Sequence, residues 1–330
     1  MKLIDAYLDY VRDVRRYSSR TVSIYGDILY KYASWVSEGK GSLEEADLIA
    51  SLNVSELRQY EVYLMETCNM VPRTVRLHLS AMSGFCRYLI CEGVLKSNPV
   101  RLVHKPKVEK RLPSFYKKEA METYFEQSGY TCTREVVDEL ASCPDSESAR
   151  KSFDALLAHL IVSILYSLGL RRSEIIGLSI GSVDFGRKVV KVHGKGDKMR
   201  EIPLVDSLSE EILLYLKAVE ALCGVERSLK EPLLVTYKGT ALYPSYVDRV
   251  IKKELGGVKG ITGQKSPHVL RHSLATELMN EGTDLNSIKE LLGHSSLAAT
   301  QVYTHSTIAR LKDIYKQAHP RAKNGGKHGN

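Results

Sequence analysis

Six polar residues in the second half of the sequence have the types that attack on a phosphodiester requires: Arg171, Lys195, His268, Arg271, His294 and Tyr303. Arginines can clamp phosphate oxygens with several N–H donors, and histidines can donate further hydrogen bonds. A lysine can protonate a leaving oxygen, and a tyrosine can attack phosphorus if neighbouring cations favour its phenolate. The set therefore predicts phosphoryl transfer at a nucleic-acid backbone.

Two of these residues share the start of one expected helix. His268 and Arg271 follow Pro267 and are three residues apart, so they face one side of that helix. The free N–H groups of a helix start favour a bound phosphate. A zinc site on His268 and His272 is the alternative, but the segment lacks the Glu of H-E-x-x-H and offers no third ligand.

Arg171 lies in a turn between two expected helices, directly after Gly169 and Leu170. A planar guanidinium at such a turn suits a phosphate that gains charge in its transition state. A surface salt bridge with Glu174 is the alternative, either for Arg171 or for its neighbour Arg172.

The other three candidates also sit at turns or element ends. Lys195, between two glycines, is expected at the tip of a β-hairpin over residues 183–204, where a plain turn lysine is the alternative. His294 follows Gly293 at the end of a helix over 286–292, where a capping or surface histidine is the alternative. Tyr303 stands nine residues further on, although most tyrosines serve packing. No segment matches the phosphate-binding P-loop pattern, so we expect no nucleotide cofactor and no metal.

The composition is that of a basic globular protein. The chain has 330 residues, 43% hydrophobic and 26% charged, with a net charge of +8. This charge favours a polyanionic partner, although a solvated basic surface is the alternative. The six cysteines form no C-x-x-C pair, which favours reduced thiols in a cytosol. We find no apolar run near ~20 residues and no signal peptide, so we expect a cytoplasmic protein without a membrane segment.

The periodicity predicts a mainly α protein with a small antiparallel β-sheet, in two domains. Helices are expected in an N-terminal domain over residues 1–98 and in a C-terminal domain over 114–319. Residues 99–113 contain three prolines and several basic residues, which predicts an extended linker. Residues 129–151 are polar and are expected to contain a loop, and 320–330 are expected to form a disordered tail. We detect no internal repeat.

Four segments together resemble the tyrosine recombinase (phage integrase) family, and within it the XerC/XerD type. They are YSLGLRRSEIIGL at 166–178, VHGKGDKMREIPL at 192–204, SPHVLRHSLAT at 266–276 and LLGHSSLAATQVYTH at 291–305. The segments YSSRTVSIYGDIL and PRTVRLHLSAM are similar to that family's helical core-binding domain. Two features depart from the pattern: Ser83 stands where an arginine is common, and the polar stretch at 129–151 is long.

The resemblance implies a role for each candidate residue. Tyr303 is similar to the nucleophile that forms a 3′-phosphotyrosyl link, and Lys195 to the general acid for the leaving 5′ oxygen. Arg171, Arg271 and His294 are similar to the groups that bind the phosphate and its transition state. His268 is similar to the proton-handling histidine, and Glu174 to an acidic residue that supports the site.

The resemblance also implies a function and its partners. It implies a two-domain clamp, with a helical core-binding and a mixed α/β catalytic domain, around double-stranded DNA. Four protomers, alike or shared with a second recombinase, would exchange strands through a Holliday junction, with an activating protein as a further expected partner. XerC-like chromosome dimer resolution is the leading expectation. Within the family, mobile-element integration and promoter inversion remain alternatives. Outside the family, the alternatives are a type IB topoisomerase and a non-catalytic DNA-binding protein.

Overall fold

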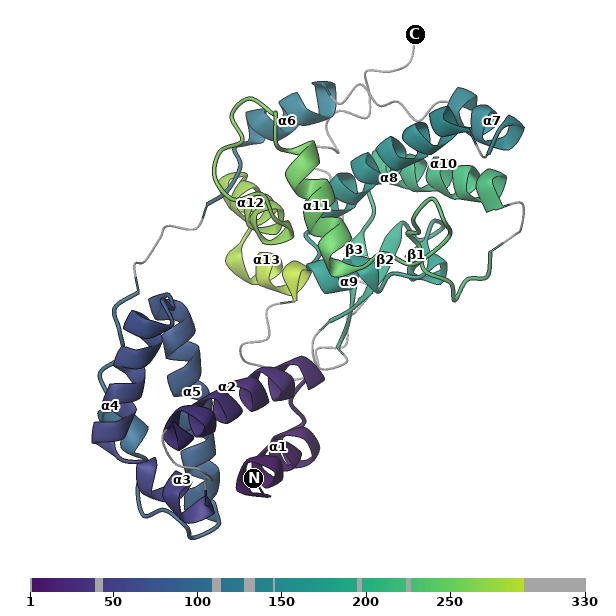
Figure 1. Cartoon of the computed structure of the whole chain (residues 1–330). Helices are drawn as coiled ribbons and strands as arrows, with labels where there is room; N and C mark the ends of the chain where they lie inside the picture. Colours follow the sequence, from purple (N-terminus) through teal and green to yellow (C-terminus); the bar gives the residue numbers. More distant parts are fainter. Residues whose placement is uncertain are drawn as a thin grey trace. The chain divides into compact units, whose positions relative to one another are not determined.

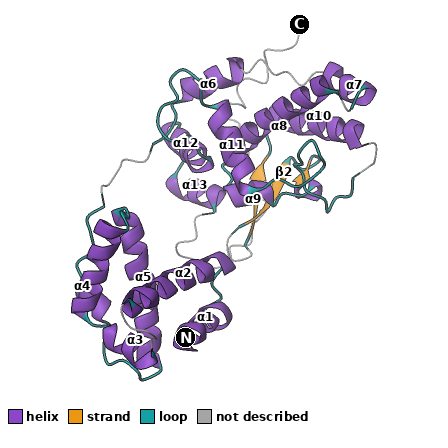
Figure 2. Cartoon of the chain, in the orientation of Figure 1, coloured by secondary structure: helices purple, strands orange, loops and turns teal. Residues whose placement is uncertain are grey.

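The structure is a computed structural model of the 330-residue chain, and it describes residues 2–38, 44–108, 114–127, 134–144, 146–194, 198–223 and 227–293. The chain divides into two compact units, Met1–Arg111 and Leu112–Asn330. Helices dominate both, and the described strands form one small antiparallel sheet in the second unit (Figures 1 and 2). The expected fold class is thus confirmed.

The first unit is helical throughout its described part. Its elements in chain order are α1 (Lys2–Asp9), the π-helical turn η1 (Tyr10–Val14), α2 (Ser19–Ser37), α3 (Glu45–Ser51), α4 (Val54–Val62), the π-helical turn η2 (Tyr63–Thr67), α5 (Pro72–Cys91) and the 3₁₀ helix η3 (Pro99–Leu102). Their apolar faces meet in one core that includes Tyr32, Tyr60 and Phe85. Ser18 caps α2 by accepting a hydrogen bond from the Thr21 N–H at 3.3 Å. The sequence pattern predicts one helix that ends before Gly39 and the next from Val54, so the short helix α3 between them was not predicted.

The structure reveals a repeat that the sequence analysis missed. Each of the pairs α1/α2 and α4/α5 is joined through a π-helical turn and then a residue of positive φ, Arg16 at 52° and Asn69 at 49°. The hydrogen bonds of the two turns match: Tyr17 N–H donates to Val11 O and Met70 N–H to Leu64 O, both at 2.9 Å. The following helix starts both contain Arg-Thr-Val. The first unit therefore contains the same helix–turn–helix element twice.

The expected extended linker does not begin at residue 99. The 3₁₀ helix η3 begins there, and Pro99, Val100 and Val103 are buried against the helices of the first unit. Asn98 fixes this segment, because its Nδ2 donates to the Ser83 carbonyl oxygen at 3.1 Å and to Ser83 Oγ at 3.0 Å. Ser83 therefore anchors the segment that leaves α5. Residues 109–113 of the expected linker lie outside the described residues.

The second unit is built around one long apolar helix. Its elements are α6 (Lys118–Gln127), α7 (Arg134–Ser142), α8 (Glu147–Leu168), α9 (Arg172–Ile176), the 3₁₀ helix η4 (Ile180–Ser182), β1 (Val183–Asp184), β2 (Val189–His193), β3 (Met199–Pro203), α10 (Asp206–Cys223), α11 (Pro244–Glu254), α12 (Pro267–Asn280) and α13 (Leu285–Leu292). Helices α7, α10, α11 and α12 all contact α8 (Figure 1). Nearly every residue of its second half is buried.

Helix α8 corrects two expectations. It is long and apolar enough to cross a membrane by length and composition, whereas the sequence analysis found no such run. The protein itself buries 78% of its most apolar window, as is usual for the core helix of a globular domain. The apolar pattern predicts a start at Phe153, but the helix begins at Glu147, where Ser146 caps it by accepting from the Ala149 N–H. Helix α7 occupies part of the polar stretch 129–151, with Leu140 buried, and the position expected for the loop, 143–146, falls between α7 and α8.

The sheet has the strand order β1-β2-β3, with both pairs antiparallel. In the β2–β3 pair, Val190 lies opposite Ile202 and Val192 opposite Arg200. Side chains alternate between the two faces of a strand, so Arg200 shares the buried face of β3 with Ile202. A charged residue thus occupies a position that the alternation assigns to the core.

Candidate active site

The described part of the second unit brings together three of the sequence-predicted residues. Arg171 lies at the N-terminus of α9, Glu174 lies within α9, and Arg271 lies on α12. His268 lies one turn before Arg271 on α12, and its side chain is exposed. The predicted positions Lys195, His294 and Tyr303 lie outside the described residues.

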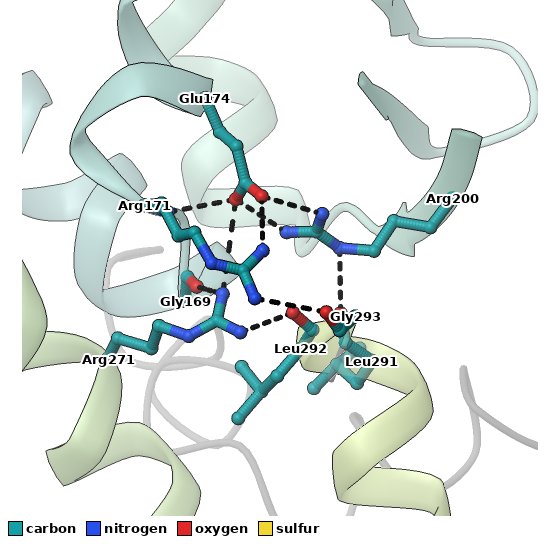
Figure 3. A network of polar contacts seen from close by, with 8 residues as sticks. All are labelled: Gly169, Arg171, Glu174, Arg200, Arg271, Leu291, Leu292 and Gly293. Atoms are coloured by element: carbon teal, nitrogen blue, oxygen red, sulfur yellow. Dashed lines mark hydrogen bonds and ion pairs between the residues drawn. The ribbon is translucent and has the colours of Figure 1, made fainter. Parts of the chain in front are cut away.

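Glu174 is the centre of the cluster (Figure 3). Its side chain is only 3% exposed. Its Oε2 accepts from the backbone N–H of Arg171 at 2.9 Å, which caps the first turn of α9. Its Oε1 accepts from Arg171 Nη1 at 2.6 Å. The predicted alternative, an Arg171–Glu174 ion pair, is therefore present, but its carboxylate is buried. Arg172 pairs instead with Asp248 of α11.

Arg200 completes the cluster, and the sequence analysis did not identify it. Its Nη1 donates to Glu174 Oε1 at 3.0 Å, and its Nη2 donates to Oε2 at 2.7 Å. The side chain is 4% exposed, so this is a buried bidentate pair. A signal was available in the sequence, because the alternation of β3 places Arg200 on the same face as Ile202.

Arg271 is held mainly by backbone acceptors. Its Nη1 donates to Gly169 O at 2.7 Å, its Nη2 donates to Leu292 O, and Nη1 lies 3.9 Å from Glu174 Oε2. Gly169 ends α8 with φ of 58°, and a Cβ there would lie 2.6 Å from Leu292 Cδ2. The positive φ and this close approach between the end of α8 and α13 both favour glycine, because any Cβ would require the Leu292 side chain to shift.

The C-terminal end of α13 is bound by all three arginines. Helix ends leave carbonyl oxygens without intrahelical partners. Here each of the last carbonyls accepts from a different arginine: Leu291 from Arg200 Nε at 3.0 Å, Leu292 from Arg271 Nη2, and Gly293 from Arg171 Nη2 at 3.0 Å. The cations also complement the partial negative charge of the helix end. The residue that follows Gly293 in the sequence is the predicted His294.

The electrostatics of the cluster favour an anion. Three guanidiniums surround one carboxylate, so the group carries a net positive charge (Figure 3). Burial would raise the pKa of Glu174, but hydrogen bonds from Arg200 and from the Arg171 backbone outweigh it and lower this pKa to about 2. Burial, assisted by the charge of Arg171, lowers the pKa of Arg271 to about 10. Both groups therefore remain charged at neutral pH.

The three arginines differ in their access to solvent. The side chains of Arg200 and Arg271 are 4% and 8% exposed, whereas that of Arg171 is 30% exposed. Arg171 is thus the most accessible of the three to a phosphate that approaches from solvent. The zinc alternative gains no support, because the described residues contain no group of three or more His, Cys, Asp or Glu side chains that could hold a metal ion.

Comparisons with known proteins place this geometry in context. The sequence model of the phage integrase family matches residues 132–310. The tyrosine recombinase XerC of Chlorobaculum parvum is 33% identical over 325 residues, which cover 97% of this chain and 94% of the relative. The tyrosine recombinase XerC of Bacillus subtilis is 32% identical over 328 residues, with coverages of 97% and 96%. The solved structure of the XerH site-specific recombinase bound to its difH substrate, in a pre-cleavage complex, is similar in fold, with a TM-score of 0.60 and 21% identity over 89% of this chain and 76% of that one.

Proposed function

The chain belongs to the phage integrase family, and on that basis we propose that it is a site-specific DNA recombinase of the XerC type. The observation that carries the proposal is the buried arginine cluster around Glu174. It supplies a preorganised excess of positive charge inside the segment that the family model matches. Such a site stabilises the charge that develops on a phosphate during attack.

The proposed reaction begins at the phenol of Tyr303. Its oxygen attacks phosphorus, and the bond from phosphorus to the 5′ oxygen breaks. Lys195 gives a proton to the leaving 5′ oxygen, and His268 takes the phenolic proton. Arg171 and His294 hold the phosphate oxygens, and the buried Arg271 adds positive charge that stabilises the transition state.

Rejoining reverses these steps at a different DNA strand. The 3′-phosphotyrosyl bond retains the energy of the broken phosphodiester, so a free 5′-hydroxyl can attack it without ATP. Glu174 does not touch the phosphate in this scheme. It fixes the positions of Arg171 and Arg200 through four hydrogen bonds.

The proposed function also includes an assembly of several protomers on DNA and a cellular role. XerH, a protein of similar fold, was solved in complex with its DNA substrate. We propose that four protomers, alike or shared with a second recombinase, pair two DNA sites and exchange strands through a Holliday junction. Among the recombination reactions, we propose chromosome dimer resolution in the cytoplasm. Loss of the gene should then produce chains of cells that fail to separate their chromosomes.

A covalent-trapping assay tests the chemistry. Duplexes that bind the protein are selected from a random-sequence library and nicked at successive positions, so that the short cleaved fragment diffuses away. The wild-type chain should form a protein–DNA adduct that survives denaturation. Tyr303→Phe should bind the same duplex and form no adduct. An adduct of equal yield with Tyr303→Phe would contradict the nucleophile assignment, and binding without any wild-type adduct would favour a non-catalytic DNA-binding protein.

Arg171→Ala tests the role of the accessible arginine. Loss of one preorganised donor should slow adduct formation by about 10²–10³-fold. The dissociation constant for DNA should change far less, because the contact strengthens in the transition state. A parallel loss of binding and cleavage would show that Arg171 contributes equally to ground-state binding.

A further inference from the structure

Arg200 is the most buried of the three arginines, yet the proposed reaction gives it no task. Its side chain has three donor atoms engaged at once: Nη1 and Nη2 on Glu174, and Nε on Leu291 O. These acceptors belong to α9 and to the end of α13, whereas Arg200 itself belongs to β3. One side chain thus connects three segments of the site (Figure 3).

Both connections lead to residues of the proposed chemistry. Glu174 Oε1 also accepts from Arg171 Nη1 at 2.6 Å, so Arg200 and Arg171 share one carboxylate. Leu291 lies two residues before Gly293, whose carbonyl accepts from Arg171 Nη2 and which directly precedes His294. Arg200 also packs closely against this helix end, since a Cβ on Gly293 would lie 3.2 Å from Arg200 Cδ.

We propose that Arg200 is a positioning residue of the recombinase site, which holds Arg171 in place through Glu174 and fixes the end of α13 from which His294 follows. The inference rests on the proposed function. At 4% exposure Arg200 is too buried to serve as a surface contact for DNA. Its effect on cleavage must therefore pass through Glu174 and α13.

The charges around Glu174 define a measurable consequence. The charged groups in contact with it are Arg171, Arg200 and Arg271, while Arg172 on the same helix is paired with Asp248. Removal of Arg200 leaves Glu174 buried with fewer donors, so its pKa should rise from about 2. Protonated Glu174 cannot hold Arg171 by an ion pair. Cleavage by such a variant should therefore fall as the pH falls through the raised pKa.

The test compares single-turnover adduct formation on the selected nicked duplex between about pH 4.5 and about pH 8, a range that begins near the ordinary pKa of a glutamate. Arg200→Met should cleave roughly 10²-fold more slowly at neutral pH, the scale of a small misplacement of reacting groups. It should also lose more of its rate in acid than the wild type does. The double variant Arg200→Met with Glu174→Gln should lack this additional loss, because the titrating carboxyl is gone.

Arg187→Met is the matched control. Arg187 also makes a bidentate pair with a glutamate of the hairpin, Glu201, at 3.0 and 2.9 Å, but its side chain is 44% exposed. It should cleave like the wild type at every pH. Arg200→Lys keeps the positive charge, so it provides a second test if Arg200→Met does not fold. Its cleavage rate should lie between that of the wild type and that of Arg200→Met.

Three results would overturn the inference. One is that Arg200→Lys cleaves at the wild-type rate with the wild-type pH profile. This result counts when Arg200→Met is folded and fully active, and also when Arg200→Met does not fold. Another is an additional acidic decline, beyond that of the wild type, that persists in the double variant. The last is a wild-type chain that forms no adduct, which would refute the proposed function and this inference with it, whereas the first two leave the proposed function intact.

Discussion

Glu174 stabilises the site because one buried carboxylate accepts hydrogen bonds from two guanidiniums and from a backbone N–H. Breaking a buried charged pair by removing one partner is costly, since the other charge stays buried. Arg200, at 4% exposure, would be left without its main counter-charge. The stability of the second unit should therefore depend on this one residue and on its protonation.

Glu174→Gln should lower the unfolding free energy by about 3 kcal/mol at neutral pH, the scale that a pKa lowered from 4.5 to about 2 implies. The lowered pKa means that this contribution is present above about pH 4.5 and is lost as the pH falls toward 2. Urea denaturation followed by circular dichroism at several pH values should show the wild type and the variant converging in acid.

Glu147→Gln is the control for that measurement. Its carboxylate pairs with Lys151 at 2.8 Å but is 81% exposed. Such surface pairs contribute at most about 1 kcal/mol. A constant difference between Glu174→Gln and wild type down to the lowest pH would contradict the stated cause.

The sequence predicted part of this site for reasons that are local. Arg171 and Arg271 stand in short motifs at a turn and a helix start, where their types already indicate phosphate chemistry, whereas the supporting role of Glu174 came from the family resemblance. Arg200 was missed because a charged residue in a short strand is usually exposed, and its partners lie 26 and 91 residues away in the chain. The catalytic roles of all six candidates, and the supporting role of Glu174, remain predictions.

At the scale of elements, the site depends on how helices end. Helix α8 ends at Gly169 and α13 at Gly293, both with left-handed backbone conformations. The two ends lie close together, because the carbonyls of Gly169 and Leu292 both accept from Arg271. A Cβ on Gly169 would lie 2.6 Å from Leu292 Cδ2, and a Cβ on Gly293 would lie 3.2 Å from Arg200 Cδ, so a bulkier residue at either end would displace a neighbouring side chain.

Gly169→Ala should lower the unfolding free energy by about 2–4 kcal/mol, through the cost of positive φ and the overlap with Leu292. Gly239→Ala is the matched control, since φ is 73° there but nothing lies within 4 Å of an added Cβ. It should cost only about 1–2 kcal/mol, the backbone penalty alone. Equal losses in the two variants, measured by urea denaturation, would rule out the packing contribution.

Element prediction succeeded where the apolar period was strong and failed where it was weak. Helices α2, α5 and α10 have long apolar faces and lie close to their expected positions, and the apolar part of α8 was also predicted, without its first turns. Helices α3 and α7 are short, with seven and nine residues, and their sequence patterns did not predict them. The two π-helical turns shift the hydrogen bonds by one residue, which no hydrophobic pattern reports, so the repeat they mark went unnoticed.

At the scale of the molecule, the two units have separate hydrophobic cores within the described residues. The only tryptophan of the chain, Trp35, packs in the first unit against Tyr32 and Tyr60. Its fluorescence therefore reports the unfolding of that unit, whereas circular dichroism reports helices of both.

Gly169→Ala should consequently shift only part of the unfolding curve. The midpoint from Trp35 fluorescence should match the wild type, while the circular dichroism curve should gain an earlier phase from the second unit. A Trp35 midpoint that moves together with the circular dichroism signal would indicate that the units unfold as one cooperative block. Tyr32→Phe removes the hydroxyl that donates to Ser51 O at 2.8 Å in the first unit. It should lower the midpoint of Trp35 fluorescence and leave the unfolding of the second unit unchanged.

At the end of α13, the atoms that accept hydrogen bonds from the three arginines are main-chain carbonyl oxygens. They are present whatever side chains stand at positions 291 and 292. In the course of evolution, other apolar residues could thus replace these two leucines while the hydrogen bonds to the arginines are kept. Deleting a single residue from α13 would be far more damaging than replacing one. It would turn the helix end by about 100° and aim every acceptor elsewhere.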